Sequence, residues 1–211
     1  MTKTKDTPSL SEVIEAMFER RLLDLHTSIP GIVQDYDPIK KTAKVRPALK
    51  RRFKDSREDQ ELNVLIDVPV GFYQTNSCIF SIPIQKGDEV LLIFSERSMD
   101  NWLKSGGIVT PNESRKFDLS DAVALPILKP IGTGPAADPD YVYIKHGTSE
   151  FKVSQDGKFA LTNGSEELID LVKQLADACT AIITNTKIGP QAPINAGQFS
   201  ALSGKISNLK L

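Results

Sequence analysis

A run of three short strand-like segments, residues 141–164, constrains the fold most, because its apolar residues have no interior of their own. Its bulky residues recur at a step of eight and are Tyr143, Phe151 and Phe159, with Val153 and Leu161 keeping the same step. Glycine, Asp-Gly and Asn-Gly between the segments are typical of tight turns. Three narrow strands cannot enclose one apolar face. We therefore expect copies of the chain to cover it in a symmetric oligomer; the alternative is a meander packed on a neighbouring domain.

Composition and charge narrow the class of protein. The chain has 211 residues, 40% of them hydrophobic, which allows one ordinary domain with appendages. A formal net charge of −1 gives no overall field that attracts nucleic acid or an anionic membrane. Cys78 and Cys179 lie far apart and fit neither a disulfide framework nor a metal-ligand spacing. Without a signal-peptide pattern or an apolar run of about 20 residues, we expect synthesis in a cytoplasm.

Residues 1–26 are expected to form a polar tail and an amphipathic helix. Ser9 or Ser11 can cap this helix, which should end near His26. Its apolar residues trace one face and are Leu10, Val13, Ile14, Met17, Phe18, Leu22 and Leu25. Pro30-Gly31 marks a clear break after it.

Residues 27–130 change to the two-residue period of β-strands. Strands are expected around residues 42–47, 62–70, 78–83 and 88–94, with a closing strand at 121–128 and a long excursion at 95–120. Short strands separated by proline and glycine favour a small antiparallel barrel of about five strands, of the OB type. Residues 131–140 have the composition of a linker, and residues 141–164 should then form a short β-prism.

Residues 165–211 are predicted to form a helical trimerisation region. The first helix has apolar residues at a 4-3-4-3 spacing, the seam of a coiled coil: Leu168, Val172, Leu175, Cys179 and Ile182. Gly189-Pro190 and Pro193 break it, and Asn195 can cap a last helix carrying Phe199, Leu202, Ile206 and Leu209. Since Ile169, Leu171 and Ile183 widen the first seam, the second helix is expected to pack back on the first. The whole chain is predicted to be mainly β with helical ends.

No motif in the sequence supports catalysis or metal binding. His26 and His146 are isolated, and no paired histidines or cysteines occur at ligand spacing. Gly-x-Ser-x-Gly is also absent from the sequence. We therefore expect no catalytic residue, no metal and no cofactor.

A basic run lies within residues 40–57 and offers a second interpretation. Its members are Lys40, Lys41, Lys44, Arg46, Lys50, Arg51, Arg52, Lys54 and Arg57. On the rim of a barrel such a run could bind single-stranded nucleic acid, although Phe53 is its only interleaved aromatic residue. A solvated loop, or a docking surface for an acidic protein, is the alternative that we prefer.

A series of motifs, in this order, resembles the baseplate central spike of contractile-tail bacteriophages. They are His26-Thr-Ser-Ile-Pro30-Gly31-Ile with Tyr36, Thr42-Ala-Lys-Val45-Arg-Pro47, Pro83-Ile-Gln-Lys-Gly87-Asp88, Leu92-Ile-Phe94-Ser95-Glu96-Arg97-Ser98, Asn101-Trp102, Asp118-Leu119-Ser120-Asp121-Ala122 and Pro126-x-x-Lys-Pro130. The likeness extends over roughly residues 20–165. Phe117 departs from the pattern, in which a histidine is usual.

The resemblance implies an OB-fold, membrane-puncturing spike that forms a homotrimer in the virion, plugs the baseplate hub below the tail tube and meets the host envelope. Many such spikes end in a long β-helix whose His-x-His tip holds iron. This chain has helices there instead, so either its helical end makes the contact or a separate tip protein does. We expect no enzymatic activity and no nucleic-acid partner. The alternatives are an OB-fold single-strand binder and the spike of a related contractile secretion system.

These considerations assign residues to two surfaces. The predicted trimer contacts are Tyr143, Phe151, Val153, Phe159, Leu161, Leu168, Val172, Leu175, Cys179, Ile182, Phe199, Leu202 and Ile206. The residues expected to face the hub are Trp102, Arg51 and Arg52.

Overall fold

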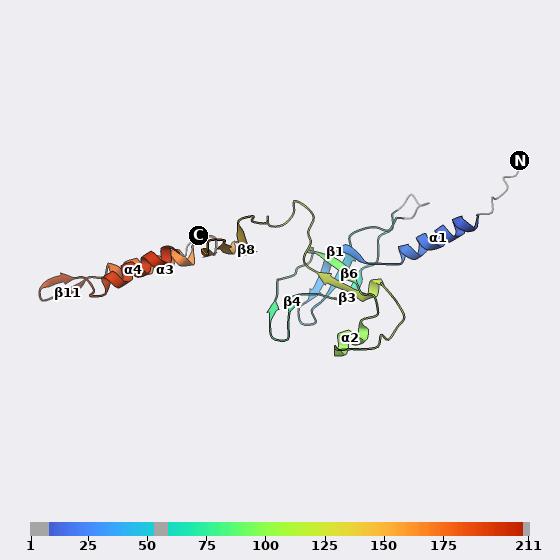
Figure 1. Cartoon of the computed structure of the whole chain (residues 1–211), viewed down its shortest axis with the longest axis horizontal. Coiled ribbons are helices and arrows are strands. Elements are labelled where there is room, and N and C mark those ends of the chain that lie inside the picture. The colour runs from blue at the N-terminus through green and yellow to red at the C-terminus, as the bar shows by residue number, and fades with distance from the viewer. Residues whose placement is uncertain (1–8, 53–58, 209–211) are drawn as a thin grey trace. The chain divides into compact units, whose positions relative to one another are not determined.

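The two kinds of periodicity in the sequence correspond to two separate units of structure. A computed structural model describes residues 9–52 and 59–208 (Figure 1). The chain divides after Thr133 into an N-terminal unit 1 and a C-terminal unit 2. Phe53, Lys54, Arg57 and Leu209, which entered the sequence predictions, lie outside the described residues.

Unit 1 begins with helix α1, Leu10–Leu23, which starts where the capping signal predicts. Ser9 and Glu12 form a reciprocal capping box, in which the backbone N–H of Glu12 donates to Ser9 Oγ and that of Ser9 donates to Glu12 Oε2. Arg20 and Arg21 stand in the last turn, where the helix dipole favours cations. No residue of α1 is buried.

A curled five-stranded sheet forms the body of unit 1. Its strands are β1 Ser28–Asp37, β2 Thr42–Pro47, β3 Leu65–Pro69, β6 Glu89–Phe94 and β7 Ala122–Leu125. They follow the order β3-β2-β1-β6-β7, and all neighbouring pairs are antiparallel. Beyond β3, Val70 forms a parallel bridge with Ala124 of β7, so that the two edges of the sheet meet. The sheet is therefore curled, and the end of β3 lies next to β7.

The predicted barrel strand at residues 78–83 is wrong. Only Ile79–Phe80 is extended, as β5, and it pairs with β4, Tyr73–Gln74, in a separate hairpin. Pro83 explains part of this, because proline cannot donate to a sheet ladder. Between β6 and β7 lie a short helix α2, Asp100–Ser105, and a 3-10 turn, Leu119–Asp121.

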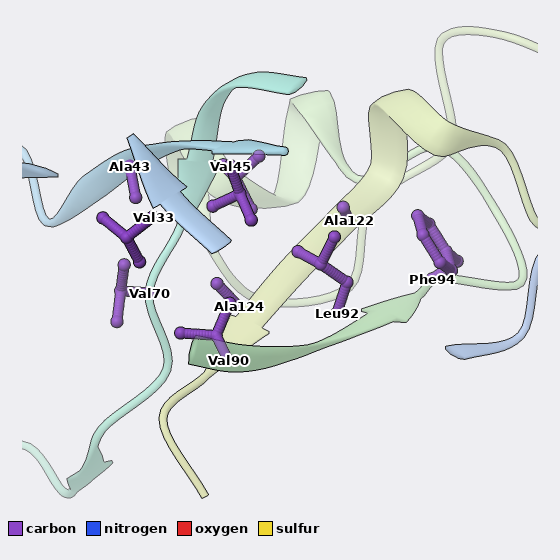
Figure 2. Close-up of a cluster of buried hydrophobic side chains, with 10 residues drawn as sticks. Val33, Ala43, Val45, Val70, Val90, Leu92, Phe94, Ala122 and Ala124 are labelled. Carbon is purple, nitrogen blue, oxygen red and sulfur yellow. The ribbon is translucent and has the colours of Figure 1, made fainter. Parts of the chain in front are cut away.

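Aliphatic side chains on the concave face of the sheet make the core of unit 1 (Figure 2). The buried members are Val33, Ala43, Val45, Val68, Val70, Val90, Leu92, Phe94, Ala122 and Ala124. Gly31 in β1 faces the same core: a Cβ there would lie 2.6 Å from Val45 Cγ1 and 3.0 Å from Leu92 Cδ1. The core is thus packed too tightly at this point for any side chain.

Unit 2 contains a three-stranded meander followed by two helices. Strands β8 Tyr141–His146, β9 Ser149–Ser154 and β10 Phe159–Thr162 pair in sequence order. Helix α3, Leu168–Thr180, and helix α4, Ala196–Ser207, pack on one another through Ile169, Ala176 and Ile206, as the prediction of a folded-back helix requires. A small hairpin that the sequence analysis did not predict, β11 Thr184–Thr186 and β12 Gly189–Gln191, connects them.

The tight packing around Gly31 can be tested by substitution. We expect Gly31→Ala to lower the free energy of unfolding of unit 1 by about 1–3 kcal/mol, because the added methyl overpacks the core. Urea unfolding followed by the fluorescence of Trp102, the single tryptophan, measures this. Gly197→Ala in α4, where a Cβ meets nothing within 4 Å, should leave that transition unchanged. An unaltered midpoint for Gly31→Ala would show that the core has room to spare.

Candidate functional site: an uncovered apolar surface

One face of the β8–β10 sheet carries two apolar rows that are largely exposed, with the polar pair His146 and Ser149 at its end. The register places three residues from the three strands opposite one another in each of two rows. The first row is Val142, Val153 and Phe159; the second is Ile144, Phe151 and Leu161. Val142 is 72% exposed and Ile144 49%. Such exposure of branched and aromatic side chains on one face marks a contact surface.

The other face of the same sheet is polar. Lys152 lies opposite Tyr143, and its Nζ is 5.4 Å from the centre of that ring, within the range of a cation–π contact. Lys145 Nζ pairs with Glu150 Oε1 at 2.6 Å, and Lys152 Nζ lies 3.1 Å from Glu150 Oε2. Hydrogen bonds from Lys145 and Lys152 hold the pKa of Glu150 below its ordinary value. The two faces therefore differ sharply in chemistry.

Tyr143 belongs to the polar face, so the expectation that it shares a face with Phe151 and Phe159 is wrong. His146 pairs with Ser149, which leaves only two residues in the turn between β8 and β9. Across a two-residue turn an even-numbered position faces an odd-numbered one. Ile144, which the sequence analysis did not select, consequently lies opposite Phe151. The two-residue length of the Gly147-Thr148 turn is the sequence feature from which this pairing could be predicted.

Helix α3 continues the apolar surface. Its buried residues, Ile169 and Ala176, pack against α4, with Phe159 of the sheet beside them. The residues predicted as a coiled-coil seam remain more open: Leu168, Val172, Leu175 and Ile182 are exposed, and Cys179 is half-buried. Leu175 is 65% exposed. This face of α3 is thus unused within one chain.

The apolar residues of α4 divide between packing within the chain and the exposed surface. Ile206 is only 8% exposed and packs within the chain against α3, so its side chain is largely occupied before any copy approaches. Phe199 is half-buried and Leu202 is exposed. Of the predicted contacts on α4, Leu202 is the one that the fold leaves most open.

The sheet face and the helix face join. Leu161 of β10 lines one shallow hollow together with Leu168 and Leu171 of α3. Polar residues complete its rim: Ser149, Thr162, Asn163 and Glu166. Leu161 of the sheet and two leucines of the helix therefore lie around the same hollow, which joins the two apolar surfaces of unit 2.

In unit 1, the segment with Trp102 is held by a buried ion cluster. Asp121 is 1% exposed and accepts from Arg115 Nε at 2.6 Å and from the backbone N–H of Met99 at 2.9 Å. Arg115 also donates to Asp100 Oδ2 at 2.8 Å, and this bond lowers the pKa of Asp100. These contacts fix both ends of the excursion 95–121 to each other. Sequence analysis missed the cluster because its members are distant in the chain.

Trp102 projects from this fixed segment as an exposed aromatic side chain. It is 53% exposed, and Leu103 and Ile108 are exposed beside it in the chain. An exposed tryptophan on a braced loop is suited to contacting another protein. The structure thus leaves the predicted hub-facing residue accessible.

The basic run is largely neutralised within the described residues. The pairs are Lys44 with Asp35, Arg46 and Lys50 with Glu61, Arg51 with Asp24, and Arg52 with Asp59. Arg51 is mostly buried and Arg52 is exposed. Cations that already pair with carboxylates contribute less to the affinity for a phosphate backbone than unpaired cations do. This pairing weakens the single-strand interpretation.

Neither a metal site nor a membrane span emerges from the described residues. No group of three or more His, Cys, Asp or Glu in residues 9–52 and 59–208 is arranged to hold a metal ion. Over the same ranges, no helix has the length and apolar character needed to cross a membrane.

Comparison with known proteins finds a family model that matches much of unit 1. Residues 29–127 match the family described as phage protein Gp138 N-terminal domain. The matched segment begins in β1 and ends just after β7, so it corresponds to the curled sheet and its excursion. No curated protein matches the chain. The family match indicates that this is a phage protein.

Removing the centre of the ion cluster should destabilise unit 1. In Arg115→Ala the buried carboxylate of Asp121 loses its cation and keeps only the donor N–H of Met99, and breaking a buried pair in this way costs about 3–5 kcal/mol. Denaturant unfolding read from Trp102 fluorescence measures the loss. Arg97→Ala removes an exposed pair with Glu96 and should change stability by no more than about 0.5 kcal/mol. Equal effects of the two substitutions would contradict the structural role of the cluster.

Proposed function

We propose that the chain is the central spike subunit of a contractile phage tail, and that it works as a homotrimer without enzymatic activity. The observation that carries this proposal is the continuous apolar surface of unit 2, which runs from the β8–β10 sheet onto α3. The family match over residues 29–127 supports a phage protein, and hence a location in the virion.

The topology of unit 1 supports an OB-type barrel. Strands β1, β2 and β3 form a meander, β6 returns beside β1, and β7 reaches back to the end of β3 through the Val70–Ala124 parallel bridge. A small five-stranded barrel closed in this way suits the fold expected for the upper part of a spike. Trp102 on its braced excursion would then contact the baseplate hub.

The trimer follows from the division of the sheet into two faces. Around a threefold axis, each sheet would turn Ile144, Phe151 and Leu161 inward and keep Tyr143 and Lys152 in solvent. Fully burying one such aliphatic or aromatic side chain contributes about 1.5–3 kcal/mol. The apolar face of α3 would continue the same interior, so that Leu168, Val172 and Leu175 of three copies meet.

This arrangement suits a mechanical role. Pairing or covering the outer strands β8 and β10 in a closed assembly removes free sheet edges, which are otherwise sites of aggregation. On contraction of the tail sheath, such an assembly would transmit force to the host envelope. Either the helical end of unit 2 or a separate tip protein would make the first contact. The spike of a contractile secretion system would use the same architecture.

A pair of substitutions on opposite faces of one sheet tests the trimer. We expect Phe151→Asp to dissociate the protein into monomers, because three carboxylates would be buried around one axis without partners. Tyr143→Asp is the matched control, since Tyr143 lies on the polar face, and it should remain trimeric. Light scattering of the purified variants at micromolar concentration reads the outcome. A trimer for Phe151→Asp, or dissociation of Tyr143→Asp alone, would contradict the proposed interior.

A further inference from the structure

Helix α1 carries a second apolar face that no described part of the chain covers. No residue of the helix is buried. The face consists of large side chains that are all exposed: Leu10, Val13, Ile14, Met17, Phe18 and Leu22. A helix of 14 residues with such a face is marginal in water by itself, because most helical stability in proteins comes from packing. This face therefore requires a partner.

The base of α1 is nevertheless attached to unit 1. Arg51 Nη2 donates to the carbonyl oxygen of Leu23 at 3.0 Å, which satisfies a free carbonyl of the last turn. The backbone N–H of His26 donates to the Phe117 carbonyl oxygen, and the His26 ring lies 5.6 Å from that of Phe94. The helix thus leaves the sheet from a fixed point.

The two faces of the helix differ in what surrounds them. Glu12, Glu15 and Glu19 line a hollow together with Arg52, and Leu22 lies in this hollow and not with the other large apolar residues. Ile14, Met17 and Phe18 line a different hollow, in which Arg21 is the only charged residue. The apolar face is consequently free for a contact outside the chain.

The spacing of the apolar residues fits a parallel coiled coil of identical helices. With Ile14 at position a, Leu10 and Met17 both fall at d, which gives a regular seam. Val13 then falls at g and Phe18 at e, positions that meet between neighbouring parallel helices. Between Leu10 and Phe18, apolar residues thus occupy one a, two d, one e and one g position, so this part of the face is wider than one neighbour covers. Leu22 falls outside this seam.

Charge at the base of the seam also fits self-association. Arg21 occupies the next a position and Asp24 the next d position. In a parallel bundle, adjacent a and d layers bring Arg21 of one copy close to Asp24 of its neighbour, which pairs opposite charges. A polar residue at one a position is a known means of fixing register in coiled coils.

We propose that α1 is a second trimerisation element, in which Leu10–Leu23 of three copies pack as a short parallel bundle. This rests on the proposed homotrimer, since a threefold axis gives the three helices the same direction along it and raises their local concentration. The contact between the three first helices then adds to the trimer of unit 2 and does not hold the chains together without it.

Crosslinking of the full chain tests this bundle. In a background in which Cys78 and Cys179 are replaced by Ser and Ala, Met17→Cys places a thiol in the seam and Ala16→Cys places one on the opposite face. A short bismaleimide should join Met17→Cys chains into covalent dimers and leave Ala16→Cys chains uncrosslinked. Adding Ile14→Asp to Met17→Cys should abolish the crosslink.

The outcomes separate this inference from the proposed function. A trimer by light scattering without a Met17→Cys crosslink would overturn the α1 bundle and leave the trimer of unit 2 intact. Equal crosslinking at positions 16 and 17 would also overturn the bundle, because it indicates random collision. A monomer that still crosslinks through Met17→Cys would refute both, because the crosslink would then report transient collisions and not a stable bundle. A monomer without crosslinks would refute both.

Discussion

The structure of this chain depends on an apolar surface that one copy cannot cover. The β8–β10 sheet has two rows of large apolar side chains on one face, and α3 and α4 pack beside Phe159 at one end of these rows. Val142, Ile144, Phe151 and Leu161 stay exposed in a single chain. Since burial of apolar surface is the main favourable contribution to folding, the unit gains most by associating. The proposed trimer follows from this uncovered apolar face, because copies of the chain would supply the interior that unit 2 lacks.

Unit 1 has the opposite character. Its sheet curls over a core of ten buried side chains, and the Arg115–Asp121–Asp100 cluster fastens the long excursion to the end of β7. This unit is complete within one chain except for its protruding parts, Trp102 and α1. A self-sufficient sheet joined to a segment with an uncovered apolar face is consistent with the proposed spike, in which unit 1 contacts the hub and unit 2 makes the trimer.

Much of this organisation could be predicted from residues that act locally. Ser9, one of two candidate caps, predicted the start of α1, and the alternating segments predicted most strands of both units. The incorrect predictions arose where the exact length of a turn, or contacts between residues far apart in the chain, determine the structure. A two-residue turn puts Tyr143 on the polar face, and Pro83 and its neighbours stay out of the main sheet. The Arg115 cluster joins residues 100, 115 and 121 in space, and no local pattern announces such a cluster.

The most direct test of the account is the mass of the purified full-length protein in solution, measured by light scattering across a dilution series in the micromolar range. If three copies supply one another's interior, the mass stays at three times that of the chain and the protein unfolds only with loss of the assembly. A well-folded species with the mass of a single chain throughout the series would contradict the account, because the face of β8–β10 would then be stable in water without a partner.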